Sequence, residues 1–264
     1  MLTLEEKWFF DHHGFIILRN VVSPEDIQLM IELGKRWHDM NLEELPPPLT
    51  STSRSGNASP TIAHWINNVQ YGDKVFQRLV LNIEIMRVII ALTRAAPCVV
   101  DCALTKNYTT SDDINFHASG QDYSVENDEP RAGFINAGTS LVDVPEGTGF
   151  VCLPGSHKRN FDPPENLSIY DGPPTVINVP VHAGDCVIFT EALYHGGRRW
   201  TAEYPRFTVF NRYIDNGSHN RFPIESHKHL ISDEVYELEQ PAVQGQKKQV
   251  VQRIIKDLES THTI

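Results

Sequence analysis

The sequence predicts a mainly β protein with flanking helices, a β-sandwich or jelly roll. Two observations support this prediction. Short runs rich in β-branched and aromatic residues, separated by Gly, Pro and Asp turns, recur over about residues 96–215. Helical patterns precede these runs over about residues 1–95 and follow them over about residues 230–264. A length of 264 residues fits one domain, 1–264, with these three parts.

The N-terminal part begins with a short helix from Leu4 to about His12, and the run Gly14–Val21 after it is typical of a strand. Ser23 is a good N-cap residue and Pro24 suits the first helical position, so a longer helix is predicted to begin there. Another helical region is expected from about Asp73 to Arg94. The helix after Ser23 has apolar residues at helical spacing, namely Ile27, Met30, Ile31 and Leu33.

Six runs in the central part have the composition of strands. They are CVVDCALTKNY, RAGFINAGTSLVDV, GFVCLPGS, VINVPV, GDCVIFTEALYH and RFTVFNRY. Within the PGSHK run, Gly155, Ser156 and His157 are expected to shape a turn rather than to perform chemistry. The tail over residues 246–258 is predicted to form an amphipathic helix that packs on its own domain.

Composition and charge disfavour several classes of partner. Lys and Arg number 23 while Asp and Glu number 34, which gives a formal charge of −11. Because nucleic acids and anionic membranes attract basic surfaces, neither is expected as a partner. Cys98, Cys102, Cys152 and Cys186 have no disulfide or metal-site spacing, so buried, reduced thiols are expected. The first residues lack the pattern of a signal peptide, so we expect a cytoplasmic protein, whose oligomeric state the sequence leaves open.

Two neighbouring runs contain the residues best suited to chemistry. The run CVIFTEALYH is predicted to be a strand that ends at His195, and RFTVFNRY returns from Arg206, eleven residues later. A short return loop would bring both residues to one end of a barrel. Arg206 shares a strand face with Thr208, and an inward-facing arginine needs an anion as its partner. A structural histidine and a surface arginine are the alternative interpretation.

His117, in the run DDINFHASGQDY, supplies a second imidazole. Two histidines from different strands, with a carboxylate and an arginine, form the arrangement of non-haem iron oxygenases. The segments GFIILRNVVSPEDI, LVDVPEGTGFVCLPGSHK, VPVHAGDCVIFTEALYHGG and PRFTVFNRY resemble the phytanoyl-CoA dioxygenase family of Fe(II)- and 2-oxoglutarate-dependent enzymes. The resemblance covers about residues 9–213 and implies a double-stranded β-helix, a cupin-like variant of the jelly roll.

The resemblance also implies roles for individual residues. His117 and His195 would be iron ligands, and Arg206 would bind the distal carboxylate of 2-oxoglutarate. Thr208 and Lys106 are further candidates for the 2-oxoglutarate pocket. The implied reaction is oxidation of a C–H bond in a small-molecule substrate, in which the cofactor breaks the bond and the protein selects it.

One position departs from the family pattern. The family has His-x-Asp, or less often His-x-Glu, at its first ligand motif, whereas this chain has His117-Ala118-Ser119. Residues i and i+2 of a strand face the same side, so both can reach one metal ion. The neutral hydroxyl of Ser119 binds a divalent ion far more weakly than a carboxylate does, and this raises the question of what completes the iron site.

Four interpretations of the Ser119 position remain open. In the first, the site is left open for chloride, as in iron oxygenases that halogenate, and the Ser119 hydroxyl donates to the halide or to water. In the second, a bulge at Gly120 swings Asp122 inward as the third ligand of a hydroxylase. Glu191 is a weaker candidate, because four residues along a strand place it about 13 Å from His195.

In the third interpretation, two histidines and water suffice for hydroxylation. In the fourth, iron is lost and the fold is a non-catalytic binding module. The missing carboxylate favours the open, halogenase-type site. The substrate itself is not readable from the sequence. The loop 46–60 is a candidate cover for a pocket, and candidate lining residues are His64, Trp65, Asn68, Asn136 and Thr139.

Overall fold

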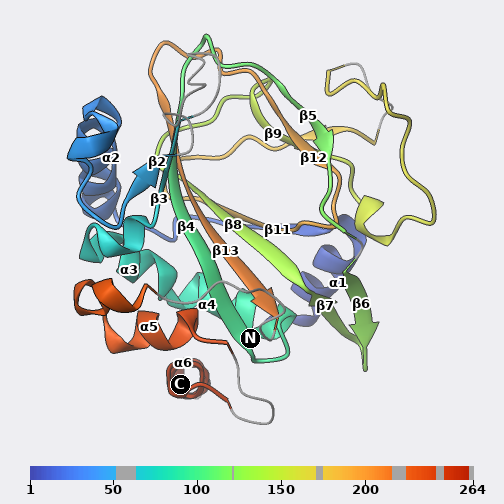
Figure 1. The fold of residues 1–264 in the computed structure, drawn as a ribbon. Coiled ribbons are helices and arrows are strands. Elements are labelled where there is room, and N and C mark those ends of the chain that lie inside the picture. The colour runs from blue at the N-terminus through green and yellow to red at the C-terminus, as the bar shows by residue number, and fades with distance from the viewer. Residues whose placement is uncertain (52–63, 121, 171–174, 216–223, 242–246, 262–264) are drawn as a thin grey trace.

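The computed structural model consists of two facing antiparallel sheets with helices on the outer side of the larger sheet (Figure 1). It describes residues 1–51, 64–120, 122–170, 175–215, 224–241 and 247–261. The prediction of a mainly β fold with flanking helices is confirmed. Residues 52–60 of the expected pocket cover lie outside the described residues.

Among the described residues, the larger sheet contains seven strands. In spatial order they are β1 (Phe15–Leu18), β11 (Cys186–Thr190), β8 (Phe134–Ser140), β13 (Arg206–Asp215), β4 (Pro97–Asn107), β3 (His64–Asn67) and β2 (Thr50–Ser51). Three of these strands come from the N-terminal part: β1 lies within the run predicted to be a strand, whereas β2 and β3 were not predicted. In the sheet, β1 pairs with β11 and β3 pairs with β4.

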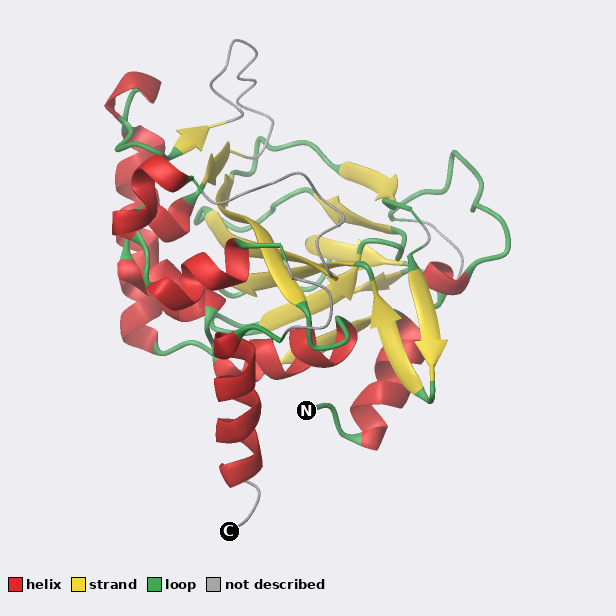
Figure 2. Ribbon diagram, turned by 60° about the horizontal axis from the view of Figure 1, so that its bottom comes forward, coloured by secondary structure: helices red, strands yellow, loops and turns green. Residues whose placement is uncertain are grey.

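The smaller sheet faces the larger one. Its strands are, in spatial order, β10 (Ile177–Asn178), β9 (Gly149–Cys152), β12 (His195–Arg198) and β5 (Ile114–His117). A separate hairpin of β6 (Tyr123–Glu126) and β7 (Glu129–Ala132) lies beside helix α1 (Leu4–His13), as Figure 2 shows.

The helices cover the outer face of the larger sheet (Figures 1 and 2). After α1 they are α2 (Pro24–Asp39), α3 (Lys74–Val80), α4 (Ile83–Leu92), α5 (Asp233–Glu239) and α6 (Gln249–Thr261). The single helical region expected over residues 73–94 is two helices, because the Asn82 side chain caps α4 by accepting from the amides of Glu84 and Ile85. None of the described helices is long and apolar enough to span a membrane.

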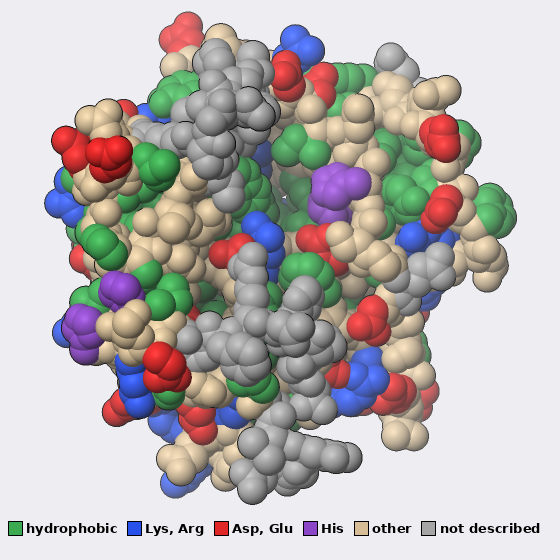
Figure 3. Space-filling view, in the orientation of Figure 1, with side chains coloured by type: hydrophobic (Ala, Val, Ile, Leu, Met, Phe, Trp, Pro, Cys, Tyr) green, Lys and Arg blue, Asp and Glu red, His purple; other side chains and the backbone are tan. Residues whose placement is uncertain are grey.

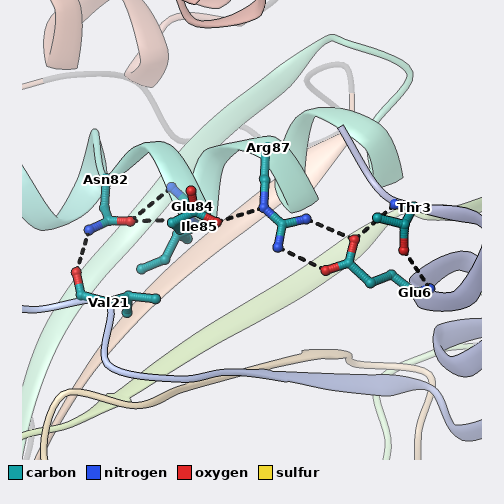
Figure 4. Close-up of polar contacts among 7 residues, drawn as sticks. All are labelled: Thr3, Glu6, Val21, Asn82, Glu84, Ile85 and Arg87. Atoms are coloured by element: carbon teal, nitrogen blue, oxygen red, sulfur yellow. Dashed lines mark hydrogen bonds and ion pairs between the residues drawn. The ribbon is translucent and has the colours of Figure 1, made fainter. Parts of the chain in front are cut away.

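A polar network fixes α1 against α4 (Figure 4). Arg87 donates to both carboxylate oxygens of Glu6, at 2.8 and 2.9 Å, and Glu6 also closes a capping box with Thr3. Burial opposes ionisation of Glu6, but the hydrogen bonds from Arg87 and Thr3 outweigh it and lower the pKa of Glu6. Asn82 donates to the carbonyl of Val21, so the same network holds the chain between β1 and α2.

Strand alternation divides the residues of β13 between two environments. Phe207, Val209 and Tyr213 belong to the main hydrophobic core under the helices. Arg206 and its even-numbered neighbours face the smaller sheet and line the cavities described below. All four cysteines are buried and free of disulfides, as predicted.

The run CVIFTEALYH is not one strand, contrary to the sequence prediction. Strand β11 ends at Thr190, a turn follows, and β12 begins at His195 in the other sheet. The turn is stabilised locally, because the carbonyl of Thr190 accepts from the amide of Leu193 and its hydroxyl accepts from the amide of Ala192. The chain therefore crosses between the sheets within four residues.

Candidate active site

Two histidines meet on the last two strands at one edge of the smaller sheet. His195 on β12 pairs directly with His117 on the neighbouring strand β5, and their ring centroids are 4.2 Å apart. The register between these strands shifts directly after His195, at Gly196 and Gly197. An added Cβ at Gly196 would lie 2.5 Å from the carbonyl oxygen of Ile114, so glycine is needed there for β5 to approach.

Backbone contacts fix the tautomer of both imidazoles. The Nδ1 of His117 lies 3.0 Å from the carbonyl oxygen of Asn115, and the Nδ1 of His195 lies 2.8 Å from that of Leu193. Because a carbonyl oxygen only accepts, each Nδ1 carries a proton and each neutral ring keeps the lone pair of Nε2. Burial lowers the pKa of His195, which favours its neutral, metal-binding form.

The two imidazoles open onto a cavity of about 360 Å³ between the sheets. In Figure 3 the surface is hollowed here, and histidine side chains lie at the rim. Much of its wall is apolar, and the described residues that line it are Trp65, Ile114, His117, Ser119, Phe134, Asn136, Phe150, Phe189, Glu191, His195, Gly196, Gly197, Arg206, Phe210 and Arg212.

The part of the cavity beside Arg206 suits a carboxylate. Arg206 lines this cavity and also the small pocket behind it, which Thr208 and Phe210 line as well. The Nε of Arg206 and the hydroxyl of Thr208 are buried without a hydrogen-bond partner among the described residues. Burial lowers the pKa of Arg206 to about 10, so the guanidinium stays charged at neutral pH. Buried donors without acceptors are costly, and a bound anion removes that cost.

Ser119 lines the cavity, whereas Asp122 does not. The Asp122 carboxylate fills the space beside Gly133 that a Cβ would occupy, and the Gly133 amide donates to the Asp122 carbonyl at 3.0 Å. The structure therefore corrects the expectation that a bulge at Gly120 swings Asp122 toward the histidines, because Asp122 is held against the chain near β8. Among the described residues, no group of three or more His, Cys, Asp or Glu is arranged to hold a metal ion.

Glu191 lines the cavity, contrary to the distance argument from the sequence. That argument assumed a straight strand from Glu191 to His195, but a turn lies between them. The charge of Glu191 raises the pKa of His195 against the effect of burial, and the Asn136 amide donates to the Glu191 carboxylate. The Glu191 carbonyl also accepts from the amide of Ser119 at 2.8 Å.

Lys106 does not reach the pocket for which it was a candidate. It pairs with Phe207 on β13 and so shares the helix-facing side of the sheet, where its Nζ lies 3.5 Å from a carboxylate oxygen of Asp39. Thr139 also lies one position out of phase with the cavity-lining residues of its strand, of which Asn136 is one. These corrections follow from the two-residue period of a strand.

The other residues predicted to line the pocket lie in different places. Trp65 lines the cavity between the sheets, and Asn68 lines a second cavity beside it. The side chain of His64 lies outside the described part of the structure.

The PGSHK run forms the expected turn and also supports His195. Gly155 has a left-handed conformation, with φ of 81°, and a short 3-10 helix follows it. The Ser156 hydroxyl accepts from the amide of Tyr194 at 2.8 Å and thereby fixes the residue before His195. Ser156 and Tyr194 are 38 residues apart in the sequence, so no local pattern predicts their contact.

Two facing sheets with paired histidines and an arginine that lines the cavity between them define a jelly-roll protein of the class that includes Fe(II)/2-oxoglutarate oxygenases. HygX from Streptomyces hygroscopicus, solved with nickel and 2-oxoglutarate bound, matches with a TM-score of 0.67 and 20% identity over 84% of this chain and 90% of that chain. SnoN, a non-heme alpha ketoglutarate dependent epimerase from nogalamycin biosynthesis, matches with a TM-score of 0.61 and 18% identity over 81% and 83%. At these identities the likeness shows the shared fold.

The sequence model of the phytanoyl-CoA dioxygenase (PhyH) family matches residues 10–208, and the chain belongs to that family. Peroxisomal phytanoyl-CoA dioxygenase of Mus musculus is 23% identical over 223 residues, which are 75% of this chain and 64% of the mouse protein. The Bos taurus protein is 22% identical over 241 residues, 83% of this chain and 70% of the bovine one. The chain thus spans about two thirds of the length of these relatives.

Proposed function

We propose that the protein binds Fe(II) through His117 and His195, binds 2-oxoglutarate through Arg206, and oxidises a C–H bond of a small molecule. One observation carries the proposal. Two imidazoles whose Nδ1 atoms face backbone carbonyls, and a guanidinium whose buried Nε has no partner among the described residues, line the same cavity. This donor set suits a ferrous ion and a dicarboxylate together.

Some residues of the chain would bind 2-oxoglutarate, and others would exclude water from the cavity. Bound iron and 2-oxoglutarate would supply the activation of oxygen. Arg206 and Thr208 would hold the far carboxylate of 2-oxoglutarate and so fix how the other end meets the histidines. Phe150, Phe189 and Phe210 line the cavity beside them, and these apolar walls limit the water that reaches the reacting C–H bond.

The open, halogenase-type site is the proposed reaction type. Ser119 lines the cavity two residues after His117, and Asp122 is held away against Gly133, so chloride would occupy the position of the family carboxylate. The Ser119 hydroxyl would donate to that chloride. Chloride beside two neutral histidines preserves the charge of a site with one carboxylate.

A hydroxylase is the second candidate, and Glu191 favours it. Its carboxylate shares the cavity with both histidines, and the amide of Asn136 holds it. In a hydroxylase, water would complete the coordination of the iron, or the Glu191 carboxylate would do so after leaving the position in which Asn136 holds it. The third possibility is a binding module without iron, and an experiment must distinguish it from the two enzymes.

The test is anaerobic titration of Fe(II) and 2-oxoglutarate, followed by the weak visible charge-transfer band of the chelate. We expect the band in the parent protein and its loss in His195→Ala. The exposed His182 provides the matched control, because His182→Ala should keep the band. A parent protein without a band, or a band unaffected by His195→Ala, would mean a binding module or a different metal site.

The same titration separates the reaction types. With an open site, added chloride shifts the band, while Asp122→Ala and Glu191→Gln both keep the affinity for iron. In the hydroxylase, chloride has no effect. If Glu191 is the ligand in that case, Glu191→Gln weakens iron binding. Loss of iron binding in Asp122→Ala alone would restore Asp122 as the ligand.

A further inference from the structure

A second cavity of about 560 Å³ adjoins the one between the sheets. The two cavities share two lining residues, Trp65 and Arg212, at which they meet. The other described lining residues are mostly polar, and the complete set is Thr50, Trp65, Asn67, Asn68, Gln70, Tyr71, Val99, Val100, Asp101, Arg212, Ile224 and Glu239.

Strand alternation places Trp65 and Arg212, the two residues that line both cavities, on one face of the larger sheet. Trp65 and Asn67 are two residues apart on β3, and Asp101 pairs with Arg212 across β4 and β13. The guanidinium of Arg212 lies 5.0 Å from the Trp65 ring centroid and 3.4 Å from an oxygen of Asp101. The charge of Arg212 is therefore already engaged within the wall.

A buried carboxylate and its donors form the far wall. Glu239, with 6% of its surface exposed, accepts from the Gln70 amide at 2.8 Å and from the Tyr71 hydroxyl at 2.5 Å. Gln70 is 3% exposed, and its Oε1 has no hydrogen-bond partner among the described residues. Burial raises the pKa of Glu239, while the two donors oppose that rise. An acceptor oxygen beside a carboxylate calls for a ligand that donates hydrogen bonds.

The charges of the described residues that line the second cavity disfavour anionic ligands. Among its described lining residues, Asp101 and Glu239 are acidic and Arg212 is the single cation. Glu191 adds a further carboxylate in the adjoining cavity. A phosphate group would meet like charges at short range, which costs several kcal/mol. An ammonium group would instead gain charge-assisted hydrogen bonds.

We propose that the second cavity binds the amine-bearing end of the substrate, as a protonated ammonium group, while the C–H bond to be oxidised lies beside the histidines. This substrate class rests on the proposed function. Gln70 Oε1, Glu239 and Asp101 receive the ammonium hydrogens, and Trp65 covers the carbon skeleton where the two cavities meet. Phosphorylated substrates, acyl-coenzyme A included, do not fit this charge pattern.

Three hexoses of similar size test the charge preference. Glucosamine carries an ammonium group, glucose is neutral and glucose 6-phosphate is anionic. Binding to the full chain is measured by ligand-observed saturation-transfer NMR, first without metal and then with Zn(II) and 2-oxoglutarate. We expect glucosamine to bind roughly tenfold more tightly than glucose, which corresponds to one charge-assisted contact, and glucose 6-phosphate not to bind.

Two variants test which residues cause the preference for glucosamine over glucose. Glu239→Gln and Asp101→Asn should each reduce the preference for glucosamine several-fold, and thermal unfolding identifies a variant that no longer folds. Asp233→Asn is the matched control, because Asp233 is an exposed acid on the same helix as Glu239 and should leave the preference unchanged. Preferred binding of the phosphate, absence of glucosamine binding, or an unchanged preference in both folded variants would overturn the proposal.

Failure of this proposal is distinguishable from failure of the proposed function. The NMR measurement without metal reports the second cavity alone, whereas the visible band reports iron and 2-oxoglutarate. A band without a preference for glucosamine overturns only the substrate class. A preference without a band removes the enzyme and leaves an amine-binding cavity.

Discussion

Replacement of Arg206 by Met tests how 2-oxoglutarate is held. Methionine approximates the length of the arginine stem but lacks the planar fork that binds a carboxylate with two hydrogen bonds. The partner residue Thr208 remains in Arg206→Met, so one neutral donor of the proposed carboxylate site is retained. The variant therefore removes the charge and leaves the shape of the pocket nearly unchanged.

The structure sets the expected size of the effect. Truncation of one partner of a buried, hydrogen-bonded charge pair costs about 2–5 kcal/mol. Arg206 as a residue is only partly buried, although its Nε is inaccessible, so the lower part of that range applies. A loss of about 2–3 kcal/mol weakens binding of 2-oxoglutarate roughly 30- to 140-fold at about 1.4 kcal/mol per factor of ten.

Anaerobic calorimetric titration of 2-oxoglutarate into the Fe(II)-loaded protein measures this loss. Arg212→Met is the matched control, because Arg212 lies on the same face of β13 but is paired with Asp101. We expect the control to bind 2-oxoglutarate within a factor of three of the parent. Without 2-oxoglutarate, Arg206→Met should be no less stable than the parent, because it removes a cation with a buried, partnerless donor. Equal affinity in Arg206→Met and the parent would refute the assignment of this pocket.

Two further predictions concern the support of the site and the pH dependence of stability. Ser156→Ala removes the acceptor for the Tyr194 amide, so metal affinity should fall about tenfold through His195, and Ser156→Thr should restore it in the same titration. Burial lowers the pKa of Lys248 to about 8, against about 10.4 in an unfolded chain. The unfolded state therefore binds more protons between these values, and urea unfolding should show the parent gaining stability relative to Lys248→Met as pH rises from about 8 to about 10. A stability difference that stays constant with pH would contradict the lowered pKa.

The sequence predicted the layers of the fold because these depend on local periodicity. Apolar residues at helical spacing, an N-cap at Ser23 and short strand-like runs identified the layers. Arg206 and Thr208 were expected to share one inward face because they are two residues apart, and both line the pocket behind the cavity. The facing of His117 and His195 came from the family resemblance, since no local pattern relates residues so far apart.

The errors came where the path of the chain changes. A predicted strand through Glu191 hid the turn that places this carboxylate in the cavity. Asp122 follows a left-handed Gly120, as a bulge would require, but its carboxylate packs against Gly133. Lys106 is one residue away from a strand position that would face the pocket. The composition of a strand does not show which of its two faces points toward the pocket.

The alternation of β13 explains how one strand can serve both proposed binding events. Arg206 and Arg212 lie on the same face and are six residues apart, which is about 20 Å along a strand. The first lines the small pocket and the second lines the junction with the polar cavity, while Phe210 lies between them in the wall. Because an even-numbered shift keeps side chains on one face, this single strand would separate the proposed dicarboxylate site from the proposed ammonium site, while the cavity that the histidines line includes both arginines.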